Sequence, residues 1–409
     1  MAYTRTGIVC QRQCARLSRT MATTVAPKRL SLAVLDDYLD ISHTHFNHIP
    51  SEQLSVTVFR DAFPAFGHPQ TTQQQKQALI EKLRPFDMIS TMRERTPFPG
   101  SLLRELPNLK VLLATGTQFE TFDLQTANEL GITVVAAPGK GRTGGKGLLS
   151  ATRPQLDIKR GGSHPTTQHT WAMILGLARN IAMDDAVLKT SHGWQTQMAQ
   201  GLTGMTLGVV GLGRLGAAVA RIGVLAWNMK VLCWSQNLTQ QKANDKAKEM
   251  GLPVLGGGLE QDSARPTFTA VSKQELFQNS DVVSLHYVLS ERSRGLVGRQ
   301  ELAWMKDSAL LVNTARGPLV DSQALQDALL THQIAGAALD VFDIEPLPAT
   351  SPWRSQEWGR NGRSNLLVTP HMGYVENGIM NTWYEETAEN VERFLQGQDL
   401  LHVINSTQP

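Results

Sequence analysis

Cysteine is scarce in this chain, which has three in 409 residues: Cys10, Cys14 and Cys233. So few thiols exclude a disulfide framework and favour a reducing compartment. Cys10 and Cys14 have the spacing of half a zinc site. Because no second pair of Cys or His lies near them in the sequence, we predict no metal site.

An excess of charge of one sign is also missing. The chain has 39 Lys and Arg against 36 Asp and Glu, a formal net charge of +3, and the basic residues form no single block. We therefore expect no nucleic acid partner. No apolar run approaches the roughly 18 residues that span a bilayer, so we expect no membrane partner. The length predicts two domains, and the hydrophobic content of 41% is that of an ordinary globular protein.

Acidic residues are absent from the first 29 residues, whereas basic residues are frequent there: Arg5, Arg12, Arg16, Arg19, Lys28 and Arg29. This bias suits a mitochondrial transit peptide. An equally weighted alternative is a disordered leader, with translation starting at Met21. We expect the protein in the cytoplasm or the mitochondrial matrix, and we exclude 1–29 from the predicted fold.

Apolar runs and helical stretches alternate over residues 30–137. The expected strands are 30–38, 54–59, 86–90 and 109–116, and the expected helices are 73–83 and 101–107. Such alternation predicts a parallel sheet with right-handed crossovers. We interpret this segment as a small doubly wound α/β unit within a flavodoxin-like domain that spans 30–165.

Periodicity stops in the segment 138–165, which is rich in Gly, Lys and Arg. A flexible insertion over the surface is the favoured interpretation, since basic glycine-rich loops are most often linkers. A patch that binds phosphate or a polyanion and an error in the splicing of the gene model are the alternatives.

A second series of strands and helices fills residues 166–377. It opens with 166–189, a predicted amphipathic helix with a threonine cap. The expected strands are 205–213, 229–235, 281–287, 309–315, 335–342 and 365–371, and the helices include 214–227 and 322–332. A last amphipathic helix, 381–398, is expected to return with the segment 378–409 to the first domain. The prediction is therefore α/β, with one doubly wound parallel-sheet domain inserted into another.

The strand TLGVV leads directly into a turn with the pattern GxGxxG and then into an apolar helix. In that context Gly211 permits the tight turn, Gly213 lets the backbone approach a diphosphate, and Gly216 lets the helix pack on the strand. The negative diphosphate would meet the helix N-terminus. A glycine-rich turn without a ligand is the weaker alternative. We predict a Rossmann domain that binds NAD or NADP through Gly211, Gly213, Arg214, Leu215 and Gly216.

The next strand ends in Ser235-Gln236-Asn237, where an acidic residue would hydrogen-bond the adenosine ribose of NAD. Ser235 and Asn237 can instead donate hydrogen bonds to a 2′-phosphate, which a carboxylate would repel. We therefore favour NADP slightly over NAD. The nearest cation is Lys242, and no Arg lies in this loop.

Three residues suited to the reduction of a 2-keto acid follow successive strands of the second series: Arg316, Glu345 and His371. Open α/β sheets bind their ligands beyond the carboxyl ends of such strands. An imidazole can protonate a carbonyl oxygen, a carboxylate can orient it and favour the imidazolium, and a guanidinium can hold the substrate carboxylate. Each residue alone could be structural, as an ion pair or a loop histidine. Three together make coincidence a poor explanation.

Five segments carry a resemblance to a known family: GLGRLG (211–216), SDVVSLHYVLSERSRGLVG (280–298), VNTARGPLVD (312–321), GAALDVFDIEP (336–346) and TPHMGY (369–374). They resemble the D-isomer-specific 2-hydroxy acid dehydrogenases. The resemblance covers nearly all of 166–398 and is fainter over 30–137, where MRERT (92–96) and PNLKVLLATG (107–116) carry it.

The resemblance implies that Arg316, Glu345 and His371 are the catalytic residues. It also implies that Asp340 lies near the nicotinamide, and Thr314 is assigned to the cofactor site with it. The substrate carboxylate would be held by Arg316 and by backbone amides of the loop Thr115-Gly116-Thr117. Arg93 and Arg95 would lie near the mouth, with Arg93 contacting the substrate. The family further implies a homodimer formed through the cofactor domain.

The chain departs from the family pattern in the insertion 138–165, in the long segments 255–270 and 350–364, and in Gln168, where the family often has Glu. The expected reaction is interconversion of a 2-keto acid, of the glyoxylate or hydroxypyruvate type, and its D-2-hydroxy acid. A 3-phosphoglycerate dehydrogenase is the alternative within the family, ranked second because no phosphate-binding cluster can be assigned. A formate dehydrogenase would carry Gln at Glu345. A non-catalytic, nicotinamide-sensing corepressor is the alternative from another class.

Overall fold

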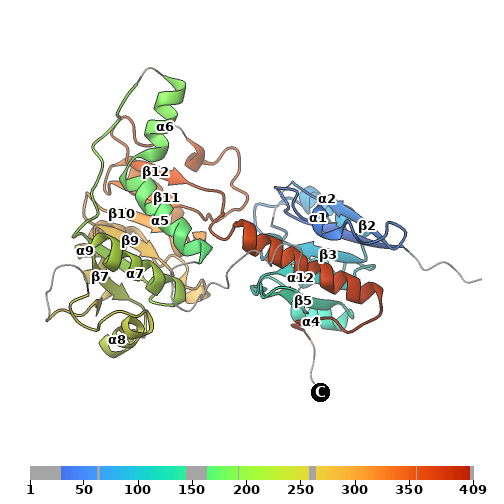
Figure 1. The fold of residues 1–409 in the computed structure, drawn as a ribbon. Helices are drawn as coiled ribbons and strands as arrows, with labels where there is room; N and C mark the ends of the chain where they lie inside the picture. The colour runs from blue at the N-terminus through green and yellow to red at the C-terminus, as the bar shows by residue number, and fades with distance from the viewer. Residues whose placement is uncertain are drawn as a thin grey trace, which may run out of the picture.

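The computed structural model describes residues 29–61, 65–143, 164–191, 193–257, 264–355 and 357–405, which form two α/β lobes (Figure 1). The leader before Arg29 and residues 144–163 of the glycine-rich segment lie outside the described residues, and so do Cys10 and Cys14. Within the described chain, no helix is both long and apolar enough to cross a membrane.

The first lobe is built on a five-stranded parallel sheet with the order β2-β1-β3-β4-β5. The strands are β1 (Leu30–Val34), β2 (Leu54–Val58), β3 (Met88–Thr91), β4 (Val111–Thr115) and β5 (Thr133–Ala137). This order is that of flavodoxin-like sheets, as predicted. The first four strands agree with the prediction, whereas β5 was not predicted, since only its Thr and Val residues favour a strand.

Helices cover this sheet on both faces. They are α1 (His43–Phe46), α2 (Gln73–Leu83), α3 (Gly100–Leu103), α4 (Leu124–Glu129) and, from the far end of the chain, α12 (Asn377–Leu395). Thr72 starts α2 with a capping box, because its hydroxyl accepts from the Gln75 N–H and the Gln75 side chain accepts in return. Trp383 and Tyr384 of α12 pack with Leu32, Val111 and Val135, so the C-terminal helix belongs to the first lobe (Figure 1).

The second lobe contains a seven-stranded parallel sheet with the order β12-β11-β10-β9-β6-β7-β8. The strands are β6 (Thr206–Val210), β7 (Lys230–Trp234), β8 (Phe268–Ala270), β9 (Val282–Leu285), β10 (Leu310–Asn313), β11 (Gly336–Leu339) and β12 (Asn365–Val368). Six of them reproduce the Rossmann order, with β12 added at one edge. The segment 255–270, which is long for the family pattern, ends in the strand β8, which pairs with β7 and was not among the expected strands.

Both faces of the larger sheet are buried, which explains why its strands read as continuous apolar runs. Val209 and Val282 face one core cluster, whereas their neighbours Val210 and Val283 face the other. The helices are α5 (Pro165–Ala178), α6 (Ile181–Thr190), α7 (Arg214–Trp227), α8 (Gln240–Glu249), α9 (Lys273–Asn279), α10 (Arg299–Trp304) and α11 (Ser322–Leu330). Short 3-10 turns occur at η3 (Glu291–Ser293), η4 (Gly317–Leu319) and η5 (Pro352–Arg354).

The single helix predicted over 166–189 is in fact two, α5 and α6. Asn180 adopts the left-handed region, with φ of +55°, and ends the first helix. An Asn accepts that conformation more readily than most residues, which is why the chain turns there. The start is also different from the prediction, since His164 caps α5 and Pro165 occupies its first turn.

Candidate active site

The glycine turn between β6 and α7 needs glycine at two positions for reasons internal to the protein. Gly211 has φ of +97°, and a Cβ there would lie 2.7 Å from the carbonyl oxygen of His286. A Cβ on Gly216 would lie 2.1 Å from the carbonyl oxygen of Gly211. Both contacts are shorter than atoms can tolerate, so the tight turn and the close packing of helix on strand depend on these two glycines.

Gly213 differs, because no atom lies within 4 Å of a Cβ built on it. It is exposed, as is Arg214, and it forms the N-cap of α7 without a side chain to accept from the first-turn N–H groups. Within the part of the chain that the structure describes, no capping side chain uses those donors, which leaves them and the positive end of the helix dipole available to an anion. An open backbone cradle at the start of a long helix fits the diphosphate of a nicotinamide dinucleotide.

The other predicted cofactor residues lie at the carboxyl edge of the same sheet. Ser235 follows β7 and is half-buried, and Asn237 is exposed. The ammonium of Lys242, in α8, donates to the Asn237 carbonyl at 2.9 Å, which puts a cation in this loop. Thr314 is buried after β10, where its hydroxyl lies 2.8 Å from that of Thr170 on α5.

Glu345 and His371 meet beyond the ends of β11 and β12, which are neighbouring strands. The Glu345 Oε2 lies 2.5 Å from the His371 Nδ1, and the Phe342 N–H donates to the Glu345 Oε1 at 2.8 Å. Both carboxylate oxygens are therefore used, so Glu345 fixes the imidazole ring. Among the described residues the His371 Nε2 has no hydrogen-bond partner, which leaves that nitrogen for proton transfer to a ligand.

Arg316 follows β10, the next strand of the sheet, and it contacts the first lobe. Its Nη2 lies 3.0 Å from the Glu94 Oε2, and its Nη1 donates to the Ala315 carbonyl at 2.8 Å. Asn313 supports this loop, because its amide donates to the Arg316 carbonyl at 2.9 Å. Arg316, Glu345 and His371 thus lie at one edge of the sheet, as their positions after β10, β11 and β12 require.

Asp340 accepts several hydrogen bonds from the loop that contains His371. It accepts hydrogen bonds from the Thr369 hydroxyl at 2.6 Å and from the N–H groups of Met372 and Gly373 at 2.8 and 3.0 Å. The His169 Nε2 lies 3.1 Å away. Burial alone would raise the pKa of Asp340, but the hydrogen bonds from His169 and Thr369 outweigh it and hold the pKa below its usual value.

The first lobe supplies the loop after β3, which contains Arg93, Glu94 and Arg95. The Arg93 guanidinium lies over the rings of Tyr374, at 4.7 Å from the centroid, and Trp383, at 5.9 Å. It makes no hydrogen bond or ion pair with any described residue. A half-buried guanidinium held only by aromatic faces is a ready partner for an anion.

The predicted substrate loop after β4 lies directly beneath. Thr115 is fully buried, and its hydroxyl accepts from the Arg93 N–H at 2.9 Å and donates to the Thr91 carbonyl at 3.1 Å. Its side chain therefore supports the Arg93 loop. Gly116 has φ of +79°, and its N–H donates to the Ala137 carbonyl at 2.9 Å.

Sequence reasoning missed two acidic side chains and one histidine of this region. Burial, helped by contact with Glu120 and opposed by Arg316, raises the pKa of Glu94 to about 7. His164 has its pKa lowered to about 4 by burial and by the charges of Arg214 and Arg93. His164 therefore lies near both the glycine turn and the Arg93 loop. The three charges of MRERT were the available signal for Glu94.

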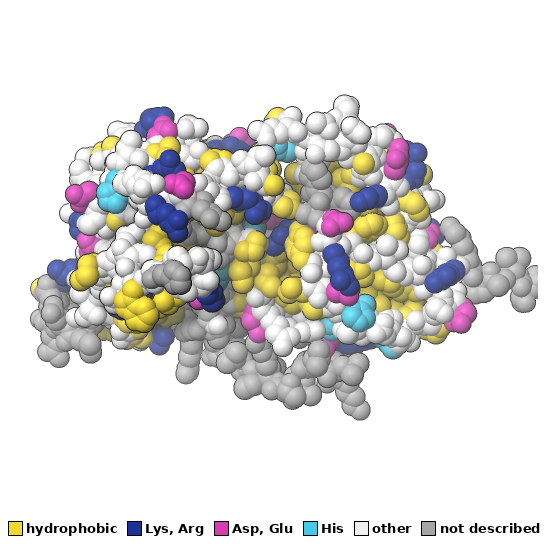
Figure 2. Space-filling model, turned by 90° about the horizontal axis from the view of Figure 1, so that it is seen from above, with side chains coloured by type: hydrophobic (Ala, Val, Ile, Leu, Met, Phe, Trp, Pro, Cys, Tyr) yellow, Lys and Arg dark blue, Asp and Glu magenta, His cyan; other side chains and the backbone are white. Residues whose placement is uncertain are grey.

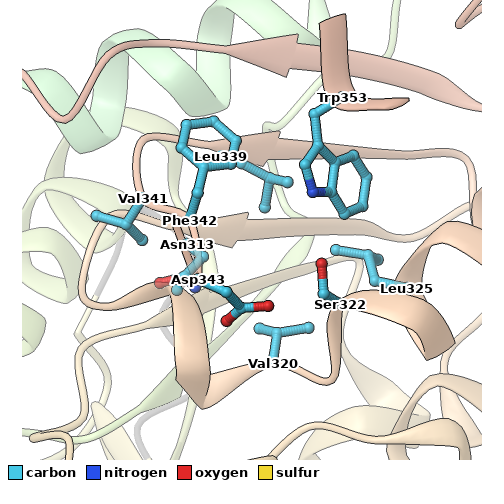
Figure 3. A pocket seen from close by; sticks show the side chains of 10 residues that line it. Asn313, Val320, Ser322, Leu325, Leu339, Val341, Phe342, Asp343 and Trp353 are labelled. Atoms are coloured by element: carbon cyan, nitrogen blue, oxygen red, sulfur yellow. The ribbon is translucent and has the colours of Figure 1, made fainter. Parts of the chain in front are cut away.

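A small pocket of about 20 Å³, enough for roughly one water, lies beside η4 and the segment that follows β11 (Figure 3). Asn313 and Asp343 border it on one side, and Trp353 and Leu325 border it on the other. Burial raises the pKa of Asp343. The pocket is too small for a substrate.

No cluster of three metal-ligating side chains occurs among the described residues. Basic and acidic side chains are interspersed on the face seen in Figure 2, which offers no continuous basic surface. The arrangement has instead a phosphate cradle, an oriented histidine and arginines at one edge. It is suited to binding a dinucleotide and transferring a proton to or from a small anionic substrate.

Comparisons with known proteins agree with this geometry. The family model described as the NAD binding domain of D-isomer specific 2-hydroxyacid dehydrogenases matches residues 171–373. The chain is 30% identical over 337 residues to a glyoxylate reductase of Aeropyrum pernix, which covers 80% of this chain and 86% of that protein. It is 29% identical over 340 residues to a D-3-phosphoglycerate dehydrogenase of Methanocaldococcus jannaschii, covering 81% of this chain but only 54% of that longer protein.

A solved structure, of a phosphoglycerate oxidoreductase from Vibrio cholerae, superposes with a TM-score of 0.68 at 30% identity. The superposition covers 90% of this chain and 99% of the other. The likeness therefore extends over both lobes and is not confined to the dinucleotide-binding sheet.

Proposed function

Because the chain belongs to the D-isomer-specific 2-hydroxyacid dehydrogenase family, we propose that it interconverts a 2-keto acid of the glyoxylate or hydroxypyruvate type and the corresponding D-2-hydroxy acid. The observation that carries the proposal is the 2.5 Å contact between Glu345 and His371, at the sheet edge that also holds Arg316. A bound reduced nicotinamide would supply the hydride to the keto carbon.

The residues of the chain would handle the proton and the charge. His371 would donate a proton from its free Nε2 to the carbonyl oxygen, and Glu345 would stabilise the imidazolium through Nδ1. Arg316 would hold the substrate carboxylate with N–H groups that Glu94 and Ala315 leave unused. In the reverse direction the neutral imidazole would accept the proton of the hydroxy acid.

For the cofactor we propose NADP as the preferred nicotinamide dinucleotide. Ser235 and Asn237 carry no negative charge, and the Lys242 ammonium lies within 2.9 Å of the Asn237 carbonyl. A 2′-phosphate would therefore meet two neutral donors and one cation. NAD is the alternative, because Lys242 is already hydrogen-bonded and no Arg lies in the loop.

We propose that the substrate domain consists of 30–165, with 138–165 as an insertion, and of 378–409, and that the cofactor domain spans 166–377. Arg93 would then face the substrate from the first lobe, whereas Thr115 and Gly116 would support its loop from below, because the Thr115 side chain is buried and the Gly116 N–H donates to the Ala137 carbonyl. The aromatic support beneath the Arg93 guanidinium keeps that cation in place without neutralising it.

Oxidation of 3-phosphoglycerate is the second candidate. It is favoured by the same unpaired Arg93, which could hold a phosphate while Arg316 holds the carboxylate. Relatives named as D-3-phosphoglycerate dehydrogenases share 28% to 29% identity with the chain, but the chain spans about half of their length.

A homodimer formed through the cofactor domain is also proposed. Helix α6 buries no residue and protrudes from its lobe (Figure 1). Large apolar side chains on α6 and on the segment after it are exposed, among them Leu188, Trp194 and Met198, the last at 97%. A second copy would cover an apolar surface that single chains seldom expose. The compartment is proposed to be the cytoplasm or the mitochondrial matrix.

The test is the oxidation of NADH and of NADPH, followed by absorbance, against glyoxylate, hydroxypyruvate, 3-phosphohydroxypyruvate and pyruvate. We expect turnover of the unphosphorylated 2-keto acids, with a higher rate for NADPH than for NADH. Preference for the phosphorylated acid would favour the second candidate. Tight binding of the dinucleotide without turnover of any acid would refute the proposal and point to a sensing role.

A further inference from the structure

The backbone of His371 lies in the left-handed region, with φ of +51°, which is uncommon and unfavourable for a residue with a Cβ. Such a conformation persists only where the surroundings over-determine it. On the side of the second lobe, Asp340 supplies part of that constraint by accepting from the N–H groups of Met372 and Gly373.

The His371 N–H also donates to the Thr369 carbonyl at 3.0 Å, and a further constraint comes from the first lobe. The Arg95 Nη2 donates to the His371 carbonyl at 2.9 Å and reaches the Pro370 carbonyl at 3.5 Å. The Arg95 Nε donates to the Tyr374 hydroxyl at 2.6 Å. One guanidinium therefore contacts the residue before His371, His371 itself and a residue three positions after it.

Arg95 is itself rigidly placed. Its guanidinium lies 5.1 Å from the centroid of the Tyr38 ring and 5.6 Å from that of Tyr374. The hydroxyls of Tyr38 and Thr96 donate to the buried carboxylate of Asp36, at 3.0 and 2.9 Å, which fixes the wall behind Arg95. The loop after β3 can therefore transmit a defined position to the loop after β12.

Tyr374 connects this network to the imidazole. Its ring lies edge-on to the His371 ring, with centroids 5.7 Å apart, while its hydroxyl accepts from Arg95. A displaced Tyr374 would leave one side of the imidazole unsupported. Glu345 would then hold the ring through Nδ1 alone.

We propose that Arg95 is a positioning residue, which reaches across the two lobes to hold the backbone of His371 and, through Tyr374, its ring. The proposal rests on the proposed function of His371 as the acid and base. Because Arg95 belongs to one lobe and His371 to the other, the imidazole keeps its orientation only while the two lobes are close enough for Arg95 to contact the loop of His371. Substrate binding between the lobes and alignment of the proton donor would thus be coupled.

The test compares Arg95→Met, Arg95→Lys and Tyr374→Phe with Arg84→Met, a control that removes a surface guanidinium paired with Glu105. Arg95→Met is expected to lower kcat by roughly 10- to 100-fold, as misplacement of a reacting group does. The KM for the keto acid and the dissociation constant of the dinucleotide should stay within about twofold of the wild-type values, because a positioning residue does not contribute to ground-state binding. Lysine lacks the fork that bonds three acceptors, so Arg95→Lys should recover little, and Tyr374→Phe should show a smaller loss of kcat.

A second readout does not depend on turnover. The protein is labelled with ¹³C at the Cε1 of its histidines, and the NMR signal of His371 is assigned from its loss in His371→Asn. The chemical shift of that signal should change in Arg95→Met and Tyr374→Phe but not in Arg84→Met. A fall in affinity for the keto acid with unchanged kcat would overturn the proposal, since Arg95 would then be a substrate anchor. An unmoved His371 signal would overturn it as well. Absence of any turnover by the wild type, with the signal moving as expected, would instead count against the proposed function alone.

Discussion

At the scale of single residues, Glu94 has the most unusual environment of the site. It is mostly buried, it pairs with Arg316 at 3.0 Å, and its neighbour Glu120 is a second carboxylate. Burial and Glu120 outweigh Arg316, and the pKa of Glu94 rises from an ordinary 4.5 to about 7. The folded protein therefore holds a proton there that the unfolded chain has already released.

The sign of the effect on stability follows from that shift. A carboxyl with a raised pKa in the folded state contributes fully below its unfolded pKa, and the contribution is lost as the pH rises through about 7. Glu94→Gln removes this titration. Between pH 5 and pH 8.5, the denaturant midpoint of the wild type should fall relative to that of Glu94→Gln.

The matched control is Glu105→Gln, which alters an exposed carboxylate paired with Arg84. Its midpoint should follow that of the wild type over the same pH range. Parallel curves for wild type and Glu94→Gln would show that Glu94 is not held with a raised pKa.

At the level of secondary structure, the turn between β6 and α7 contains one glycine that packing requires, Gly216, and one that packing does not require, Gly213. A Cβ at 216 would lie 2.1 Å from a backbone carbonyl oxygen, whereas a Cβ at 213 meets nothing within 4 Å. The two glycines therefore offer a matched pair of substitutions on one turn.

Gly216→Ala should lower the free energy of unfolding by about 1–3 kcal/mol, as overpacking does. Gly213→Ala should leave that free energy unchanged and raise the dissociation constant of the dinucleotide by roughly tenfold, about 1.4 kcal/mol. Chemical denaturation and a fluorescence titration with the reduced dinucleotide measure the two effects. Normal dinucleotide affinity in Gly213→Ala would mean that the cradle binds something else.

Most elements could be predicted because their signals are local. The apolar runs of the strands and the pattern GxGxxG lie within ten residues each, and their order along the chain implies the sheet edge where Arg316, Glu345 and His371 lie. The strand β8 has only three residues, and the break between α5 and α6 rests on Asn180 alone, so neither leaves a periodic pattern from which it could be predicted. The contacts of Glu94 and Arg95 with residues more than 200 positions away depend on how the lobes meet, which no local pattern encodes.

At the scale of the whole molecule, the exposed apolar surface around α6 predicts a dimer. Sedimentation velocity of the wild type should give twice the mass of the chain. The double substitution Leu188→Glu and Met198→Glu, at side chains 54% and 97% exposed, should give the monomer mass because it places charges in the interface. Leu39→Glu, at an exposed leucine of the other lobe, is the control and should remain dimeric. A monomeric wild type would contradict the proposed assembly.

The proposed function depends on His371 as the residue that transfers the proton during reduction of a 2-keto acid. Its most direct test is the kcat of His371→Asn with the best keto acid of the panel, because Asn tolerates the positive φ of this position but cannot act as an acid. We expect kcat to fall by roughly 10²- to 10⁴-fold while the dissociation constant of the dinucleotide is unchanged. A variant that retained most of the wild-type kcat would contradict it.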